Sequence, residues 1–315
     1  MCGEMQEAWS RRWRGWLIGG AAAGIVAALI ALALVLQQSP PSTPIEQPAS
    51  TYQAPVIAAP LSLDRERELK PKDTFSECSS CPEMVVLPSG SFTMGSPSSE
   101  EGRRNDEGPQ HRVAFDRLFA VGKFPLTFDE WDACAADRGC GGYRPVDEGW
   151  GRGRRPAINV SWDDAKSYVT WLSRKTGKRY RLLTEAEYEY ATRAETQTRY
   201  PWGDDIGRGH ANCNGCDSQS QGKTSPAGSF APNQFDLYDV VGNVWEWVED
   251  CVHPNYDNAP MDGSAWTVGN CAARVIHGGS WYSAPEFVRS ANRNWVPSDD
   301  RGDNLGFRVA RTLTP

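Results

Sequence analysis

One uncharged apolar run, residues 16–36 (WLIGGAAAGIVAALIALALVL), constrains this chain of 315 residues more than any other feature. As a helix with a rise of 1.5 Å per residue, the run is about 31 Å long, which matches the hydrocarbon core of a bilayer. Three arginines precede it, at positions 11, 12 and 14, and no Lys or Arg follows it until Arg65. The positive-inside rule therefore places residues 1–15 in the cytoplasm.

This asymmetry predicts a single-pass protein of the inner (cytoplasmic) membrane, with transmembrane helix 16–36 and a periplasmic C-terminal part. The alternative is a cleaved signal peptide with its small-residue site at residues 31–33. The apolar region of a signal peptide usually has about 7–15 residues, and this run is longer, which favours an uncleaved anchor. Gly20 and Gly24 form a GxxxG pattern, so a homodimer or a larger membrane complex stays open.

The chain changes character twice after the apolar run. Residues 37–60 contain prolines at positions 40, 41, 44, 48, 55 and 60, and residues 64–72 are highly charged. Such a stretch does not bury a core, so residues 37–77 are predicted to be a Pro-rich linker and residues 78–315 the globular domain. The formal net charge of −7 provides no basic surface for phosphates, which excludes a generic nucleic-acid-binding protein.

Short elements separated by Gly, Pro, Asn and Asp characterise the globular part. Two segments have clear helix signals: a capping-box-like start at Ser161 with a stop at Gly177, and a capping box at Thr184 that opens a helix to about Ala194. Strand patterns cover residues 84–87, 112–121 and 307–310. The predicted fold class is α+β, irregular and loop-rich.

The globular part contains eight of the nine cysteines, and they form close couples. The couples are Cys78/Cys81, Cys134/Cys140, Cys213/Cys216 and Cys251/Cys271. In an oxidising compartment the simplest prediction is four disulfides between nearest neighbours. The alternative is a zinc site made by the two CxxC pairs, which have suitable internal spacing. Cys2, on the cytoplasmic side, would stay reduced.

Seven motifs, in order along the chain, carry a family resemblance. They are MVVLPSGSFTMG (84–95), PAINVSWDDA (156–165), YRLLTEAEYEYA (180–191), PWG (201–203), GNVWEW (242–247), RVIHGGSW (274–281) and NLGFR (304–308). Together they resemble the formylglycine-generating enzyme, or sulfatase-modifying factor, family, over residues 81–311. The resemblance implies a C-type-lectin-like fold.

The resemblance also implies a catalytic chemistry that this sequence does not match. Catalytic members oxidise a sulfatase cysteine to formylglycine with O₂ and a copper ion held by two cysteines that follow a Gly-Gly-Ser motif. Ser283 stands at the first of those positions here, and no cysteine follows Cys271. A hydroxyl is a poor ligand for Cu(I), so bound copper is not expected. Whether the chain is an enzyme, with an unidentified catalytic residue, stays open.

The resemblance suggests iron and calcium as two further candidate metals. Related branches catalyse other oxidations, including ergothioneine sulfoxide synthesis with histidine-bound iron and pyoverdine maturation. The four histidines here are not at the i, i+4 spacing of a helical metal pair, so iron stays undecided. The resemblance implies calcium, because family members bind it through main-chain carbonyls and a few side-chain oxygens, which suits the six to eight oxygens that this ion takes. The matching positions are Asn212, Cys213, Asp217 and Gln219 for one site and Gly242, Val244 and Glu246 for a second. The alternative is that Glu246 caps a turn and Asp217 lies in a solvated turn.

A polar and aromatic segment after the Gly-Gly-Ser motif is the candidate substrate groove that the resemblance implies. Its members are Trp281, Tyr282, Ser283, Glu286, Arg289, Asn292 and Arg293. Arginine and aromatic side chains suit the recognition of a peptide or protein. The alternative is that these residues form buried ion pairs with the acidic segment 299–303.

These observations predict a calcium-stabilised, disulfide-braced periplasmic domain that serves as a non-copper binding or accessory protein for a peptide or protein partner. One alternative is an oxidoreductase of the same family that uses another metal on a peptide or protein substrate. Another is a structural subunit of a membrane complex.

Overall fold

The structure, a computed structural model, describes residues 59–216, 220 and 222–314. The predicted cytoplasmic segment 1–15, the predicted span 16–36 and most of the predicted linker lie outside these residues. Within residues 59–216, 220 and 222–314, no helix has the length and apolar character needed to cross a bilayer.

Helices form where the sequence supplies a cap. They are α1 (Leu63–Arg67), α2 (Phe128–Ala136), α3 (Trp162–Thr176) and α4 (Glu185–Arg193), with short 3₁₀ turns η2 (Asn105–Glu107) and η3 (Pro285–Phe287). Both predicted helices are confirmed. Ser161 and Thr184 cap the N-termini of α3 and α4 through capping boxes, and Gly177 ends α3 in the left-handed conformation.

Helix α2 has no counterpart among the sequence predictions. It begins at a capping box in which the side chain of Thr127 accepts a hydrogen bond from the Glu130 amide, and the Glu130 carboxylate accepts one from the Thr127 amide. The pattern TFDE at residues 127–130 carried this signal, but the helix has only nine residues and a weak apolar stripe.

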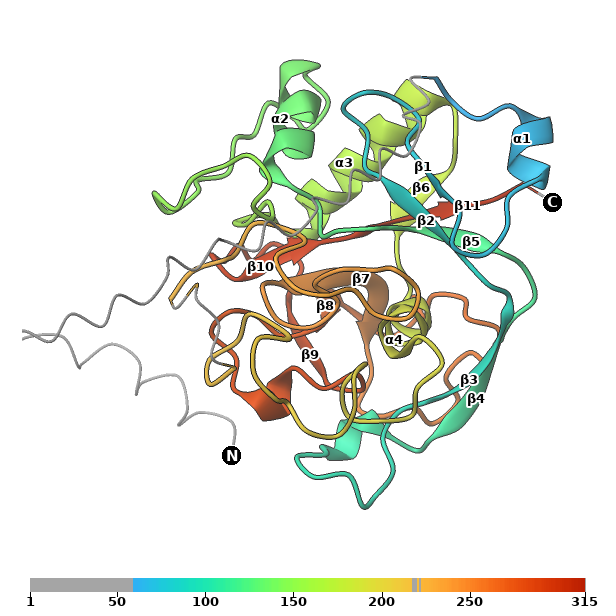
Figure 1. Cartoon of the computed structure of the whole chain (residues 1–315), viewed down its shortest axis with the longest axis vertical. Coiled ribbons are helices and arrows are strands. Elements are labelled where there is room, and N and C mark those ends of the chain that lie inside the picture. The colour runs from blue at the N-terminus through green and yellow to red at the C-terminus, as the bar shows by residue number, and fades with distance from the viewer. Residues whose placement is uncertain (1–58, 217–219, 221, 315) are drawn as a thin grey trace, which may run out of the picture. The chain divides into compact units, whose positions relative to one another are not determined.

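Eleven strands in the described part of the chain form three sheets (Figure 1). The first has the order β1 (Thr74–Phe75), β2 (Met84–Leu87), β5 (Phe119–Gly122), β11 (Val309–Thr312), β6 (Tyr180–Leu182). The second has the order β10 (Leu305–Phe307), β7 (Trp245–Val252), β8 (Asn270–His277), β9 (Arg293–Pro297), and the third pairs β3 (Gly90–Met94) with β4 (His111–Phe115). The fold is mixed α and β, as predicted.

Two of the three expected strands are each divided in two. Residues 112–121 contribute to β4 and β5, which belong to different sheets, and residues 307–310 contribute to β10 and β11. The second break falls at Arg308, whose buried guanidinium binds the Glu246 carboxylate with N···O distances of 3.0 and 3.1 Å. This ion pair with a residue 62 positions away divides a strand that the local sequence predicts to be continuous.

The five-stranded sheet is buried on both faces, because successive apolar side chains point to opposite faces and each face packs against a core of its own. On β2, Met84 and Val86 face a core shared with α2 and α3, whereas Val85 and Leu87 face a second core shared with α4. Figure 1 shows α2 and α3 on one side of this sheet and α4 with strands β7, β8 and β9 on the other. Loops that leave the second layer carry the candidate groove.

The domain begins earlier than the predicted boundary at Cys78. Leu61 and Phe75 are in the core, with 5% and 3% of their surface exposed. The carboxylate of Glu66 on α1 lies 2.8 Å from the Arg311 guanidinium on β11. The residues after the Pro-rich stretch therefore fold with the domain, and the charged composition of residues 64–72 reflects ion pairs as well as solvent exposure.

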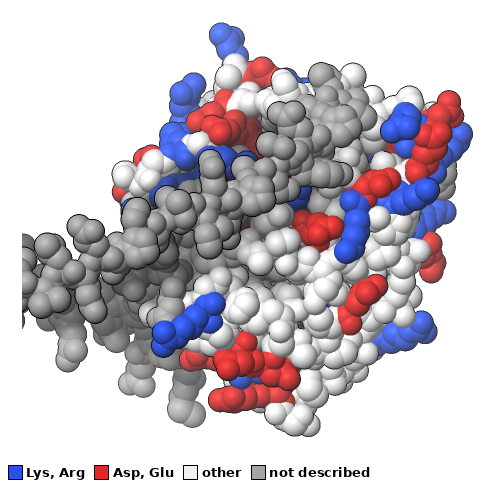
Figure 2. All heavy atoms as spheres, viewed as in Figure 1, with Lys and Arg blue, Asp and Glu red and all other residues white. Residues whose placement is uncertain are grey.

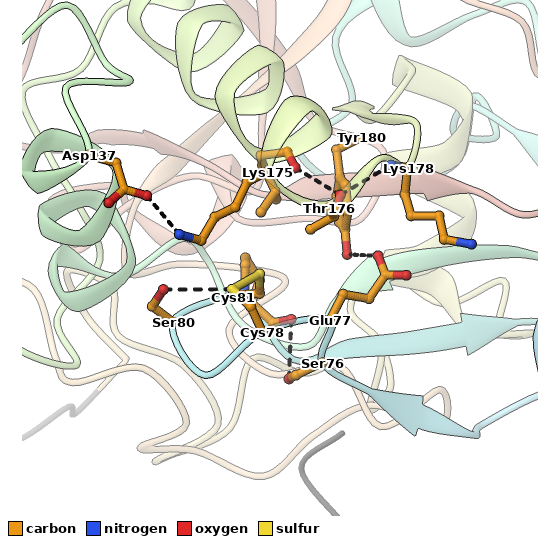
Figure 3. The surroundings of a disulfide bond; sticks show 12 residues. Ser76, Glu77, Cys78, Ser80, Cys81, Asp137, Lys175, Thr176, Lys178 and Tyr180 are labelled. Atoms are coloured by element: carbon orange, nitrogen blue, oxygen red, sulfur yellow. Dashed lines mark hydrogen bonds and ion pairs between the residues drawn. A yellow bond between two sulfur atoms is a disulfide. The ribbon is translucent and has the colours of Figure 1, made fainter. Parts of the chain in front are cut away.

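All four predicted disulfides form. They join Cys78 to Cys81, Cys134 to Cys140, Cys213 to Cys216 and Cys251 to Cys271. The zinc alternative is wrong, because the four sulfurs of the two CxxC pairs are bonded within each pair. Figure 3 shows the first disulfide beside Ser80, Asp137 and Lys175.

Candidate functional site

Two glycines shape the loop that carries the candidate groove. Gly278 and Gly279, directly after β8, have φ angles of 92° and 71°, in the left-handed region. A Cβ atom on Gly279 would lie 2.5 Å from a methyl group of Val288. The close approach folds residues 280–288 back on themselves and brings Ser280 next to Ser283.

Ser280 and Ser283 form a buried hydroxyl pair. Their Oγ atoms are 3.3 Å apart, and the Ser280 amide donates to Ser283 Oγ at 3.0 Å. Ser283 is 9% exposed, and its carbonyl accepts a hydrogen bond from the Asn214 amide. All eight cysteines in the described part of the chain are in disulfides, so those residues offer no free thiol to copper.

Aromatic side chains flank the serine pair. Trp281 is half-buried and stacks edge-on against Trp150 with ring centroids 5.4 Å apart, and its indole nitrogen donates to the Asp303 carbonyl at 3.3 Å. Tyr282 is 52% exposed and Phe287 is 41% exposed. Large rings that remain in solvent beside a polar pair provide the apolar contact area that a protein or peptide ligand uses.

A pocket of about 790 Å³ adjoins the same loop. It is lined by Glu101, Gly102, Arg199, Tyr200, Asp204, Asp205, Ile206, Pro285 and Glu286. Four of these residues are acidic and one is basic, and the Arg199 guanidinium already binds Glu101 at 2.9 Å. The pocket is therefore electronegative, which favours a cationic ligand.

The three remaining groove candidates are buried. Arg289, Asn292 and Arg293 are each at most 3% exposed. The guanidinium of Arg289 binds Glu107 and Glu100, and that of Arg293 binds Glu185. Their partners are not the 299–303 segment of the alternative interpretation. Burial works against the charged form of Arg289, but the Glu107 and Glu100 carboxylates raise its pKa.

Behind the loop lies a buried polar cluster that sequence reasoning missed. One oxygen of Glu185 accepts hydrogen bonds from Arg293 at 2.7 Å and from Tyr256 at 3.1 Å, and it lies 3.1 Å from His277 Nε2. Although burial opposes ionisation, Arg293 and His277 lower the pKa of Glu185 to about 2. Burial and the Glu185 charge raise the pKa of the neighbouring Asp250 to about 7.

Two buried carboxylates lie at the second predicted calcium position. Glu246 and Asp239 are both buried, and burial raises the pKa of both carboxyls, that of Asp239 to about 6. Arg308 binds both carboxylate oxygens of Glu246 and donates to the main-chain carbonyl of Asp239 at 3.3 Å. The Asp239 carboxylate accepts a hydrogen bond from the Gly228 amide, and the charges of Arg308 and Arg154 both act on it. The backbone of Gly242 and Val244 lies between them in sequence. Carboxylate and carbonyl oxygens are the donors that a hard cation takes, and Asp239, whose charge acts on Glu246, is a carboxylate that sequence reasoning did not single out.

The first predicted calcium position is only partly described. Asn212 is buried, and its amide nitrogen donates to the Lys223 carbonyl at 2.9 Å. Cys213 is in the disulfide with Cys216. Asp217 and Gln219 lie outside the described residues.

The four histidines are dispersed. Each contacts a different aromatic ring: His210 stacks on Trp202, His253 on Trp266 and His277 on Tyr188, whereas His111 is tilted against Tyr256. Within the part of the chain that the structure describes, no three His, Cys, Asp or Glu side chains come together as a metal group.

Comparisons with known proteins agree with the seven motifs. A family model described as a sulfatase-modifying factor enzyme 1-like domain matches residues 70–313. The chain is 31% identical to the inactive C-alpha-formylglycine-generating enzyme 2 of Bos taurus, over 72% of this chain and 87% of that protein. It is 29% identical to the serine/threonine-protein kinase pkn1 of Chlamydia caviae, over 82% of this chain.

The chain spans 41% of the length of that kinase and about half of several formylglycine-generating enzymes that it matches. Among solved structures, PvdO from Pseudomonas aeruginosa is 46% identical and superposes with a TM-score of 0.72, covering 78% of this chain and all of that one. With the family model covering most of the chain and these relatives sharing its fold, the chain belongs to the sulfatase-modifying factor family.

Proposed function

We propose that this chain is a non-copper member of the family that binds a peptide or protein partner, as a binding or accessory protein at the periplasmic face of the inner membrane. The observation that carries the proposal is the Ser280–Ser283 hydroxyl pair. Ser283 of this pair stands at the position where the resemblance puts the first copper-binding cysteine, and the eight cysteines of the described residues are bonded to one another. The similarity to a relative named as inactive is consistent with this interpretation.

The loop and the adjoining pocket suggest the chemistry of the partner. The exposed rings of Tyr282 and Phe287 offer apolar contact, and the acidic pocket beside Glu286 favours Lys or Arg side chains. A peptide segment that combines basic and aromatic residues would satisfy both features. Figure 2 shows that charges of both signs alternate with uncharged areas on one face of the molecule.

Calcium has a structural role in this proposal. Asp239 and Glu246, with backbone oxygens of Gly242 and Val244, would hold the ion and relieve the repulsion between the two buried carboxylates. Asp239, Gly242 and Val244 precede β7, and Glu246 lies in it. The ion would therefore fix the start of β7, in the sheet from which residues 278–288, the groove loop, emerge.

The anchor completes the proposal. Residues 16–36 would hold the domain at the membrane, and residues 37–60 would act as an extended spacer. Deleting residues 16–36 and supplying a cleavable secretory signal peptide in their place should move the protein from the membrane fraction to the soluble periplasmic fraction of cells. Retention of the deleted form in the membrane would contradict this role.

The decisive experiment compares catalysis with binding in the full-length protein purified in detergent. With copper and O₂ supplied, a cysteine-containing sulfatase peptide should remain unconverted by mass spectrometry. A photoreactive residue at Tyr282 should crosslink a partner in cells, whereas one at Leu63, equally exposed, should not capture it. Oxygen-dependent conversion of the peptide, or stoichiometric copper or iron in the native protein, would favour the oxidoreductase instead.

A further inference from the structure

The Cys78–Cys81 disulfide forms part of the wall of a polar cavity. The cavity has a volume of about 330 Å³ and is lined by Ser76, Ser79, Ser80, Cys81, Glu83, Phe124, Thr127, Asp129, Glu130 and Arg154. Cys81 is 7% exposed and Cys78 is half-buried. This disulfide can therefore be reached by a small molecule without unfolding of the domain.

A second disulfide of the same ring size provides the comparison. Cys213 and Cys216 are also separated by three positions, but they are 4% and 1% exposed and pack with Tyr200, Val241 and Val288. The two CxxC disulfides thus have the same connectivity and differ in what surrounds them. A structural role alone does not require polar side chains to gather around one of them.

The cavity contains an acid whose proton affinity suits exchange at neutral pH. Thr127 donates to Glu130 from its amide and from its hydroxyl, both at 2.7 Å, and both bonds end on Oε2. Burial raises the pKa of this carboxyl to about 7. Oε1 carries neither of these bonds, so it is the oxygen that can take up or release a proton.

Two further groups complete the arrangement. The Arg154 guanidinium packs over the Phe124 ring at 5.1 Å and donates one bond to the Ala227 carbonyl, and it belongs to no ion pair within the described residues. Its charge also acts on Glu130 and on the buried Asp239, so an incoming carboxylate would share this guanidinium with them. Ser80, which also lines the cavity, has its Oγ 3.7 Å from Cys78 Sγ (Figure 3), where a hydroxyl can stabilise a thiolate.

We propose that the Cys78–Cys81 disulfide is the reactive centre of a thiol–disulfide exchange site that admits a small thiol carrying a carboxylate. Arg154 binds the carboxylate and orients the sulfur toward Cys81. Glu130 is the base that accepts the thiol proton. The site is separate from the partner-binding loop of the proposed function, and neither depends on the other.

The exchange balances in two steps. The incoming thiol loses its proton to Glu130, and its sulfur bonds to Cys81 Sγ while the Cys78–Cys81 bond breaks and Cys78 leaves as a thiolate, which is then protonated. A second thiol molecule attacks the mixed disulfide at the small-molecule sulfur and releases the Cys81 thiol. Two thiols are oxidised to one small disulfide, the protein disulfide is reduced to two thiols, and the reverse sequence restores it.

The test uses the folded full-length protein in detergent with L-cysteine as the thiol, followed by acid quenching and peptide mass spectrometry. The expected result is a cysteinyl adduct on Cys81, while Cys213–Cys216 stays intact. Cysteamine, which lacks the carboxylate, should react with the wild type several-fold more slowly than L-cysteine does. In Arg154→Gln the rate with cysteamine should be the same as in the wild type. Equal reactivity of the two CxxC disulfides, or no adduct on Cys81, would overturn the proposal.

A matched pair of variants tests the base. Glu130→Gln keeps an oxygen that accepts the capping bonds of Thr127, and it should lower the rate at pH 7 roughly tenfold or more, with a smaller deficit at pH 9, where the thiol ionises unaided. Asp137→Asn, which lies beside the same disulfide but outside the cavity, should leave the rate unchanged. An identical pH profile for Glu130→Gln and the wild type would show that Glu130 is not the base.

Discussion

Arg289 binds Glu107 through both terminal nitrogens, with N···O distances of 2.9 and 2.5 Å, and both side chains are inaccessible to solvent. The same guanidinium binds Glu100 at 2.6 Å and the Gly102 carbonyl at 2.7 Å. One side chain therefore ties the loop after the Ser280–Ser283 pair to the loop around residues 100–107. The ion pairs of Arg289, rather than the backbone hydrogen bonds of a helix or strand, therefore hold the groove loop in place.

Removing this guanidinium should destabilise the domain strongly. Arg289→Leu leaves the buried carboxylates of Glu107 and Glu100 without their cation, and loss of one member of a buried pair costs roughly 3–5 kcal/mol. Arg301→Leu breaks the partly exposed pair with Asp164 and should cost about 1 kcal/mol or less. Urea unfolding followed by tryptophan fluorescence measures both, and equal losses would contradict the buried role of Arg289.

The ion pairs of Glu66 predict a particular acid sensitivity. Burial opposes ionisation of this carboxyl, but hydrogen bonds from Arg311, Thr314 and Lys178 lower its pKa to about 2, from a usual value near 4.5. A lowered pKa means that the stabilisation is fully present above pH 4.5 and is lost as the pH falls through 2.

Glu66→Gln should therefore lower the free energy of unfolding by up to about 3 kcal/mol at neutral pH, and the difference from the wild type should shrink below pH 4. Thermal unfolding at a series of pH values measures this. Glu68→Gln, on the exposed pair with Arg65, is the control and should show little change. A deficit that is constant across the acid range would mean that Glu66 acts through packing alone.

The sequence predicted features that depend on neighbouring residues, and it did not predict contacts between residues far apart in the chain. The caps at Ser161 and Thr184 were readable because capping involves residues three positions apart. The break at Arg308 and the burial of Arg289 were not, because their partners are 62 and 182 positions away in sequence. The groove prediction thus separated into accessible side chains at residues 281, 282 and 286, the buried Ser283, and the buried residues 289, 292 and 293, of which Arg289 and Arg293 form ion pairs.

Calcium should stabilise the domain through its second predicted position. Because burial and the nearby Asp239 charge raise the pKa of Glu246, a divalent cation bound between the two carboxylates would remove an unfavourable accumulation of negative charge. Calcium at about 100 times its dissociation constant should add roughly 2.7 kcal/mol to the free energy of unfolding, and a chelator should reverse the gain. Asp239→Asn should reduce the calcium-induced rise in Tm, whereas Asp116→Asn, exposed and remote in sequence from this position, should keep it. A rise in Tm that is identical in both variants would place calcium elsewhere.

Charge in the pocket beside the groove loop should control the affinity for basic peptides. A fluorescent peptide that alternates Arg and Trp would bring its cations to Glu286 and Asp205 and its rings to Tyr282. Glu286→Lys places a positive charge at the rim, so binding measured by fluorescence anisotropy should weaken several-fold at low ionic strength and much less at about 0.5 M salt, where exposed charges are screened. Asp116→Lys makes the same charge change outside this pocket and should have little effect. If both variants weaken binding equally, the peptide responds to net charge alone, and the pocket does not determine the partner.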